Sequence, residues 1–425
     1  MLLVARRDRL ATVLDVFGKW ELSAVEIGRV TDSGRVVLFF DGKIVADLPA
    51  APLSDRAPLY DRPRAAVIPV GSAGWEELTE PADYGASLRA ILASPNVAEK
   101  SWIWTQYDHM VGTNTVERPG GDAAVLRIKG TSKAIALKSD VNPFFVACDP
   151  YRGAAIAVAE AARSIAATGA RPLAVTDCLN FGNPERPEIM GQFEAAVRGL
   201  ADACRALSVP VVSGNVSFYN ETDGRPILPT PTVGMVGLLD DVSRHVRLPF
   251  RAKGDVIALL GESRDELGAT EYLRTVHGRD EGPCPEVDLE AERRLVDLLV
   301  RLAGRGLLSS AHDVSDGGLA VALAESAMTG ELGAVVRLES ALRLSSLLFG
   351  ETTGRVVLSF RPENEGRIRS AAAELGVPLT VIGSVGGARL RIAVGGRRVV
   401  DEDVASLRGL WKSAFERAIE SAEVL

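Results

Sequence analysis

Two apolar runs of this sequence end in side chains that could bind a phosphorylated ligand. PLAVTDCLNFGNPE ends its run at Asp177, and VPVVSGNVSF ends its run at Gly214 and Asn215, with Ser217 close behind. Ligands of open α/β sheets gather beyond the carboxyl ends of strands. Asp177 and Asn215 offer the hard oxygen atoms that Mg²⁺ prefers, and Gly214 lets a phosphate approach the backbone. Two Asx-type turns explain the same residues equally well.

Acidic residues form a second group of candidates. Asp122 stands at the entrance of an expected strand, Asp140 ends another strand, and Glu160 lies on the helix that follows. The stretch SSAHDVSDGGLAVALAESA adds a histidine, two carboxylates and a serine before a helix, namely His312, Asp313, Ser315 and Asp316. Carboxylates at strand ends indicate a divalent metal with nucleotide phosphates. Helix capping by Ser315 or Asp316 is an equally good explanation of the last stretch.

Composition limits the classes of function. The chain has 425 residues and a net charge of −8, which argues against nucleic acid as a partner. Its four cysteines show no CxxC spacing, so zinc and disulfides are not expected and a cytoplasmic location fits. Neither a signal peptide nor a membrane span is expected. P-loop and Rossmann motifs are missing, and the four histidines occur in unrelated contexts, so no nucleophile arrangement is predicted.

The pattern of apolar residues predicts an α/β protein. Residues 84–93 form a short helix, and strands and helices then alternate from about residue 121. The predicted elements are strands near 123–128 and 133–139, a helix over 151–168, a strand over 172–177, a helix over 188–206, and strands over 209–213 and 231–240. Residues 253–261 open a further domain that runs to the C-terminus.

The two ends of the chain resemble each other. Both read as strand, helix, strand, turn, strand, turn, strand, and an Ile-Gly pair closes the second strand in each, at Ile27 and Ile382. Arg6 and Arg361 precede these isoleucines by the same number of residues. Chance similarity of two βαβ-like segments is the alternative, but matching order over some fifty residues favours a duplication.

The repeat suggests four segments. Residues 1–50 are the tail of a preceding α/β domain, and residues 51–100 are a linker with a short helix. Residues 101–243 form one α/β domain, and residues 244–425 form another. A segment of this size cannot cover both faces of its own strands with apolar contacts. We therefore expect the chain to begin inside a larger architecture.

The long motifs of the sequence resemble a known family. GGDAAVLRIKGTSKAIALKSDVNPFFVACDPYRGAAIAVAEAARSIAATGARPLAVTDCLNFGNPE, VVSGNVSFYNET, YDHMVGTNTV and AHDVSDGGLAVALAESA are similar to the synthetase (large) subunit of phosphoribosylformylglycinamidine synthase, in its small bacterial form. One departure is Met110, where the family usually has Gln. The resemblance implies mixed α/β sheets in the duplicated two-domain architecture of the aminoimidazole-ribonucleotide-synthetase-like ATP-binding superfamily. Only the second copy would be complete here, and the resemblance implies that residues 101–243 are its N-terminal-type α/β domain for dimerisation and ATP binding and residues 244–425 its C-terminal-type α/β domain.

The same resemblance assigns roles to individual residues. Asp177 and Gly214 are implied ATP contacts, Asn215 an implied Mg²⁺ ligand, and Ser217 an implied contact to formylglycinamide ribonucleotide. Catalytic histidines are expected in the missing first half, and none is assigned in this chain.

Larger members of the family hold a second, noncatalytic nucleotide. The residues that match this auxiliary site are Asp140, Glu160, Asp313 and Ser315. Ser164 stands where such a site would have an asparagine. We therefore expect the auxiliary pocket to be weakened or empty.

The implied reaction is the ATP-dependent conversion of formylglycinamide ribonucleotide to its amidine in purine biosynthesis, as a C–N bond-forming ligase. Ammonia would come from glutamine through a glutaminase subunit, with a small accessory subunit and the N-terminal half of the synthetase as further partners. Two alternatives stay open. The chain could be a noncatalytic scaffold half of a split or truncated synthetase, or another ATP-using enzyme of the superfamily, such as aminoimidazole ribonucleotide synthetase or a selenophosphate-synthetase-like protein.

Overall fold

A computed structural model describes residues 1–71 and 74–422 of the chain. The chain divides into two compact units, Met1–Asp61 and Arg62–Leu425, which we describe separately. The residues predicted as linker are thus shared between the two units. Among the described residues, no helix combines the length and the apolar character needed to cross a membrane.

The first unit contains elements that depend on local contacts. A 3₁₀ turn η1 (Arg7–Arg9) leads into helix α1 (Leu10–Lys19). Strands β1 (Arg35–Phe40) and β2 (Lys43–Pro49) form an antiparallel hairpin, and a 3₁₀ turn η2 (Ala51–Leu53) follows.

Two strands predicted for this unit are not formed. Residues 1–6 and 22–31 have no regular structure, whereas the sequence pattern predicts a strand on each side of helix α1. A β-strand needs a hydrogen-bonding partner, and none pairs with these segments in the described residues. The prediction of a strand–helix–strand succession is therefore wrong here, while the helix and the hairpin are confirmed.

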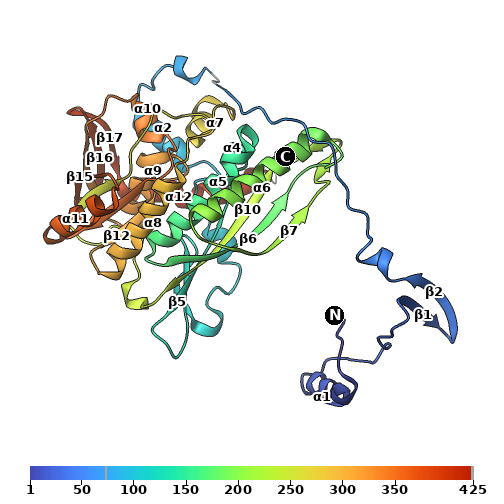
Figure 1. The fold of residues 1–425 in the computed structure, drawn as a ribbon. Helices are drawn as coiled ribbons and strands as arrows, with labels where there is room; N and C mark the ends of the chain where they lie inside the picture. Colours follow the sequence, from blue (N-terminus) through green and yellow to red (C-terminus); the bar gives the residue numbers. More distant parts are fainter. Residues whose placement is uncertain (72–73, 423–425) are drawn as a thin grey trace. The chain divides into compact units, whose positions relative to one another are not determined.

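The second unit contains a six-stranded mixed sheet in the order β3-β4-β5-β10-β6-β7. Its strands are β3 (Thr115–Glu117), β4 (Ala124–Arg127), β5 (Ala134–Asp140), β10 (Thr230–Leu239), β6 (Arg171–Asn180) and β7 (Val211–Ser217). Helices α4 (Pro143–Cys148), α5 (Pro150–Ala167) and α6 (Pro187–Ala206) belong to the same region. Figure 1 shows α5 and α6 running along the side of β10, β6 and β7.

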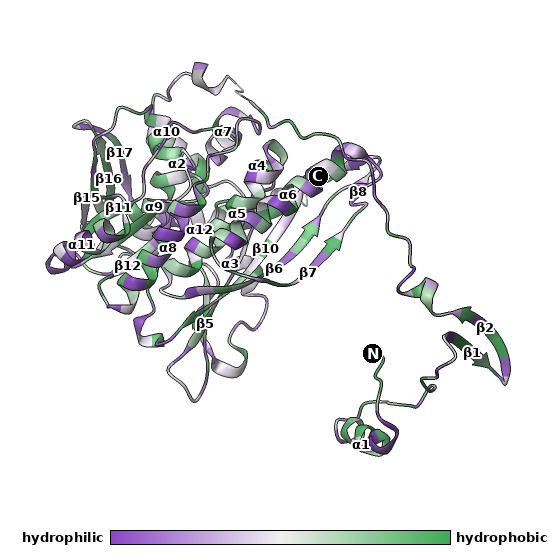
Figure 2. Ribbon diagram, viewed as in Figure 1, coloured by the Kyte–Doolittle hydropathy of each residue, from purple (hydrophilic) through white to green (hydrophobic). Residues whose placement is uncertain are grey.

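One face of this sheet is covered and the other is open. Along β10, every second residue is buried, among them Val233, Met235 and Leu239, and these pack with the Ala-rich α5 in one apolar core. All residues of β7 except Ser217 are exposed. Figure 2 shows hydrophobic residues along β6 and β7 even so. The sheet therefore ends in an exposed edge strand.

A seven-stranded sheet fills the second half of this unit, in the order β12-β14-β11-β15-β13-β16-β17. Its strands are β11 (Val256–Leu260), β12 (Ser310–Asp313), β13 (Ala334–Leu338), β14 (Val356–Phe360), β15 (Leu379–Val385), β16 (Arg389–Val394) and β17 (Arg397–Asp403). The helices here are α7 (Glu271–His277), α8 (Leu289–Gly304), α9 (Gly318–Gly330), α10 (Leu344–Phe349), α11 (Glu365–Leu375) and α12 (Val404–Ala422). A 3₁₀ turn η6 (Pro362–Asn364) precedes α11.

Short elements connect these layers. They are α2 (Tyr84–Leu92), α3 (Ser101–Trp104), the two-residue strands β8 (Glu221–Thr222) and β9 (Arg225–Pro226), and the 3₁₀ turns η3 (Trp75–Glu77), η4 (Val111–Thr113) and η5 (Val242–Arg244). The helices predicted over 84–93, 151–168 and 188–206 are present as α2, α5 and α6. The chain is thus an α/β protein with mixed sheets, as predicted.

Candidate functional site

The four residues with implied ATP, metal and substrate roles lie on two neighbouring strands. Strands β6 and β7 run parallel, and their register places Asp177 beside Gly214 and Asn180 beside Ser217. The sequence pattern ended the second strand at Gly214 and predicted a turn there. That boundary is wrong, because pairing with β6 continues β7 through Ser217. The residues therefore have the rigid spacing of a sheet.

The carboxylate of Asp177 lies against the bare backbone of Gly214. A Cβ atom added at residue 214 would overlap Oδ1 of Asp177, so a side chain here would displace the carboxylate. Burial raises the pKa of Asp177 above its ordinary value, and a hydrogen bond from the backbone N–H of Asn215 opposes this shift. The lack of a side chain at Gly214 therefore leaves room for the Asp177 carboxylate.

Asp177 and Asn215 point to opposite faces of the sheet. Asp177 is paired with the buried Val233 and so shares the face covered by helices. Asn215 is paired with Cys178 on the open face, where its Nδ2 atom lies 3.9 Å from the Cys178 Sγ atom. Because β7 is the edge strand, the two faces meet beside these residues. A ligand that follows this edge can reach both.

Ser217 is held by the loop that follows it. Its hydroxyl donates to Oδ1 of Asn220 over 3.1 Å, and Nδ2 of Asn220 donates to the carbonyls of Ser217 and Phe181. Phe218 packs on Phe193 with ring centroids 4.9 Å apart. The aromatic and amide residues after Ser217 thus fix the end of the strand.

A bridge of side chains connects this loop to the segment that precedes the sheet. Tyr219 has a left-handed backbone with φ of 61°, and its hydroxyl donates to Oε1 of Glu185 over 3.2 Å. The same oxygen lies 3.4 Å from Nη1 of Arg62. Farther along, the carbonyl of Ala65 lies so close to Gly191 of α6 that a Cβ atom there would overlap it. Residues 62–65 therefore run along the start of α6 and contact it.

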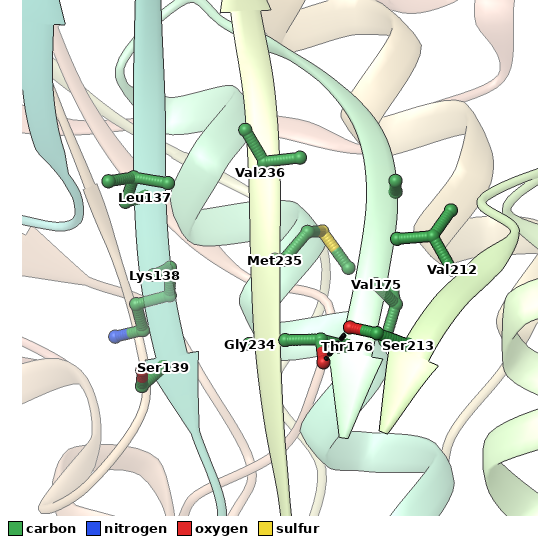
Figure 3. A pocket seen from close by; sticks show the side chains of 11 residues that line it. Leu137, Lys138, Ser139, Val175, Thr176, Val212, Ser213, Gly234, Met235 and Val236 are labelled. Atoms are coloured by element: carbon green, nitrogen blue, oxygen red, sulfur yellow. Dashed lines mark hydrogen bonds between the residues drawn. The ribbon is translucent and has the colours of Figure 1, made fainter. Parts of the chain in front are cut away.

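An open groove leads up to the strand ends from the exposed face of the sheet. It has a volume of about 490 Å³ and lies over β5, β10, β6 and β7 (Figure 3). The hydroxyls of Thr176 and Ser213 are 2.7 Å apart on its wall, one residue before Asp177 and Gly214. Most of its other lining residues are apolar, among them Leu137, Val212 and Val236.

Two of the four residues predicted for the auxiliary site, Glu160 and Asp313, come together around an arginine that the sequence analysis did not single out. Arg163 of α5 pairs with Asp313 through Nε, and its Nη2 lies 3.2 Å from the other oxygen of that carboxylate. Its Nη1 donates to Oε1 of Glu292 over 2.6 Å, and its Nη2 is 3.7 Å from Oε2 of Glu160. The guanidinium is buried.

Asp140 and Ser315 lie at the margin of this cluster. Oδ2 of Asp140 is 3.6 Å from Nζ of Lys138. Burial raises the pKa of Asp140 to about 6, although the charge of Lys138 opposes the shift. Burial, with the charges of Asp140 and Asp313, also raises the pKa of Glu160 well above its ordinary value. Ser315 lies in the turn between β12 and α9, where its carbonyl accepts a hydrogen bond from the backbone of Gly318.

His312 lies between two carboxylates. Its Nδ1 is 3.1 Å from Oδ1 of Asp122, and its Nε2 is 2.9 Å from Oε2 of Glu325. Burial lowers the pKa of His312, but Asp122 and Glu325 outweigh burial and raise the pKa to about 10. The histidine is therefore a charged link between the entrance of β4 and helix α9.

The capping explanation of this region is wrong. Helix α9 begins after Gly317, which has φ of 76°, and no side chain caps it. The backbone N–H of Gly317 instead donates to Oε1 of Glu351 over 2.8 Å. A carboxylate distant in sequence thus replaces the expected local cap.

Sequence reasoning missed Arg163, Glu292 and Glu325. One signal for Arg163 was present, because it is the only charged residue inside the Ala-rich run AARSIAA. A lone arginine in a buried helix needs carboxylate partners. Which carboxylates supply them depends on residues more than one hundred positions away, and no local pattern carries that information.

Two family profiles match the chain. Residues 120–239 match the family described as "AIR synthase related protein, N-terminal domain", and residues 252–395 match "AIR synthase related protein, C-terminal domain". Together they span more than half of the chain, and the first covers the six-stranded sheet from β4 to β10.

Curated relatives match nearly the whole chain. The phosphoribosylformylglycinamidine synthase subunit PurL of Moorella thermoacetica is 48% identical over 418 residues, which is 98% of this chain and 57% of that protein. The PurL subunit of Anaeromyxobacter dehalogenans strain 2CP-C is 49% identical over 92% of this chain and 54% of that protein. The chain thus spans somewhat more than half the length of the curated relatives it matches.

Solved structures share the fold. One described as "T. maritima PurL complexed with FGAR" is 21% identical, covers 77% of this chain and 54% of that chain, and has a TM-score of 0.64. Phosphoribosylformylglycinamidine synthase II from Thermotoga maritima is also 21% identical, covers 77% of this chain and 52% of that chain, and has a TM-score of 0.61.

Proposed function

The chain belongs to the AIR synthase related family, and from this premise we propose that it takes part in converting formylglycinamide ribonucleotide to formylglycinamidine ribonucleotide. The observation that carries the proposal is its kinship with a PurL subunit over 98% of its length. The edge formed by β6 and β7 is compatible with this role, since it offers polar side chains beside an exposed backbone.

The triphosphate of ATP lies along this edge in our proposal. Asp177 and Gly214 contact the nucleotide, with Gly214 leaving the backbone N–H groups accessible to phosphate oxygens. Mg²⁺ would neutralise phosphate charge during transfer. Asn215 supplies an amide oxygen for this ion from the open face. Within the described residues, no group of three or more His, Cys, Asp or Glu side chains could hold a metal ion alone. In our proposal the ion arrives with the nucleotide, whose phosphates complete its ligands.

Ser217 orients the ribonucleotide. Its hydroxyl donates to Asn220, which fixes its orientation, so it can accept a hydrogen bond from a substrate O–H or N–H group without first losing rotational freedom. In the proposed reaction the amide oxygen of the substrate attacks the γ-phosphorus and releases ADP. Ammonia then adds to the carbon of the iminophosphate, and inorganic phosphate leaves with that oxygen. Ammonia comes from glutamine through a glutaminase partner, with a small accessory subunit in the assembly.

An assay of ADP release tests the proposal. The chain is incubated with ATP, Mg²⁺, formylglycinamide ribonucleotide and ammonium, alone and with the remaining part of the Moorella thermoacetica relative. We expect ribonucleotide-dependent ADP release in the mixture and little from the chain alone, because the catalytic histidines are assigned to the other part. A mixture that binds the ribonucleotide yet releases no ADP would sink the proposal.

Substitutions at the strand edge test the assigned residues. Gly214→Ala should weaken Mg²⁺–ATP binding at least tenfold, because the added methyl group displaces Asp177. Gly409→Ala is a matched control, since nothing lies within 4 Å of a Cβ atom at that position. Asn215→Ala should weaken the binding of Mg²⁺–ATP and leave that of metal-free ATP unchanged. Calorimetric titration measures both, and unaltered affinity in Gly214→Ala would remove this edge from the ATP site.

A further inference from the structure

Helix α5 carries a buried arginine into a cluster of carboxylates from the other half of the second unit. Only 1% of the Arg163 side chain is exposed, and the side chains of Glu292 and Asp313 are 1% and 2% exposed. These partners lie on α8 and β12, whereas Arg163 and Glu160 lie on α5. The guanidinium is therefore the shared partner of acids from three elements.

Three acids of this region, Asp140, Glu160 and Asp313, are the ones that the family resemblance assigns to a second nucleotide site with its divalent ion. Both oxygens of Asp313 already accept from Arg163, and the Ser164 hydroxyl lies 3.5 Å from one of them. Oε2 of Glu160 is 3.7 Å from the guanidinium. Oδ2 of Asp140 faces Nζ of Lys138 at 3.6 Å. Each of these three carboxylates thus faces a cation that belongs to the chain.

The donor set consequently does not fit a divalent ion. A Mg²⁺ ion placed between these carboxylates would lie beside two fixed positive charges and would have to displace a bidentate guanidinium. Ser164 offers a hydroxyl where an amide oxygen was expected. The planar guanidinium, with its five donors, instead matches the carboxylates around it.

We infer that the Arg163 guanidinium occupies the place of the divalent cation, so that this cluster is a closed ion-pair junction and not a second nucleotide site. The junction links α5 to α8 and β12 without metal or nucleotide. This inference concerns a region away from the β6–β7 edge, and it stands whether or not the proposed reaction is correct.

Manganese titration followed by electron paramagnetic resonance tests the inference, with Mn²⁺ alone and with Mn²⁺–ADP as probes. All proteins carry Asp177→Asn and Asn215→Ala, so that the proposed ATP edge does not contribute. We expect the parent protein to bind Mn²⁺ no more tightly than its Asp140→Asn derivative. Removing the guanidinium with Arg163→Ala should create one Mn²⁺ site per chain, at least tenfold tighter. The matched variant Arg163→Lys keeps a cation and should not gain this site.

Two results would overturn the inference. One is a Mn²⁺ or Mn²⁺–ADP site in the parent protein that Asp140→Asn abolishes. The other is a folded Arg163→Ala protein, judged by circular dichroism, that gains no Mn²⁺ site. If Arg163→Ala does not fold without metal, refolding in the presence of Mn²⁺ decides. Recovery of the native spectrum supports the inference, and failure to recover contradicts it, provided that Arg163→Lys folds.

Discussion

Residues 7–49 and residues 362–403 contain the same succession of elements in very different surroundings. Each has a 3₁₀ turn, a helix and a hairpin, namely η1, α1, β1 and β2 in the first unit and η6, α11, β16 and β17 in the second. In both segments an arginine on the first strand of the hairpin pairs with an aspartate twelve residues later. These arginines, Arg35 and Arg389, also donate to the backbone carbonyl of that aspartate.

The agreement extends to the backbone. The hairpin turns use left-handed residues, with φ of 47° and 77° at Asp41 and Gly42 and 54° and 78° at Gly395 and Gly396. A register shift follows Leu38 in one hairpin and Ile392 in the other. Turn geometry fixes the register of a hairpin, so both copies reach it from local sequence alone.

The copies differ where a strand needs a distant partner. In the second unit, β14 and β15 lie on either side of β11, and Ile382 of β15 is 3% exposed. The corresponding Ile27 of the first unit is 78% exposed and lies outside any strand. The comparison teaches that local sequence is enough to form the turn, the helix and the hairpin. The strands on either side of the helix form only where neighbouring strands of a sheet are present to pair with them.

The largest expected contrast comes from removing the isoleucine in each copy. Ile382→Ala should lower the free energy of unfolding of the second unit by about 3 kcal/mol, because it leaves a cavity in a packed core. Ile27→Ala should change stability by less than about 0.5 kcal/mol, since that side chain is exposed. Denaturant unfolding followed by tryptophan fluorescence measures both, and equal effects would contradict the comparison.

A pH titration sharpens the contrast between buried and exposed charge. The pKa of His312 is raised from 6.5 to about 10, so its stabilising contribution is complete below pH 6.5 and is lost as pH approaches 10. The second unit should lose on the order of 2 kcal/mol of stability between pH 7 and 9. His312→Gln should flatten this dependence in urea unfolding measured across that range. A parent protein with constant stability from pH 7 to 9 would refute a charged His312.

The glycines after the two isoleucines allow a smaller test. A Cβ atom at Gly383 would overlap the carbonyl of Val335 on β13, whereas nothing lies within 4 Å of one at Gly28. Gly383→Ala should therefore cost about 1.5 kcal/mol through overpacking, and Gly28→Ala should cost almost nothing. Thermal melting of the paired variants is the measurement. A destabilised Gly28→Ala protein would mean that residue 28 packs against something in solution.

The smallest effect is expected where the copies agree. Arg35→Ala and Arg389→Ala each remove a partly exposed ion pair on a hairpin, and each should lower stability only slightly. Raising the salt concentration should reduce both effects. Backbone amide hydrogen exchange in β1 and β16 reports them separately. A tenfold difference in the change of exchange between the two hairpins would break the similarity of the copies.

Much of the fold follows from the sequence, and the exceptions share a cause. Helices α2, α5 and α6 and the two hairpins were predictable because their periodicity and turn residues are local. The end of β7 was misjudged, because Gly214 and Asn215 are typical turn residues that pairing with β6 keeps in a strand.

The candidate site divides in the same way. The sequence predicted that Asp177, Gly214, Asn215 and Ser217 lie close together, because they stand at the ends of two strands, and these strands are neighbours in the sheet. The opposite faces of Asp177 and Asn215 depend on strand register, and the guanidinium among the acids depends on packing between distant elements. Neither the register nor the packing can be predicted from a short stretch of sequence.

The ion pairs of Arg163 also bear on how the second unit comes apart. Separating α5 from α8 and β12 would leave a guanidinium and two carboxylates without their partners in an apolar interior. Neither sheet can then melt while the other persists without meeting that electrostatic penalty. Residues 62–422 should consequently unfold in one cooperative calorimetric transition despite their two sheets.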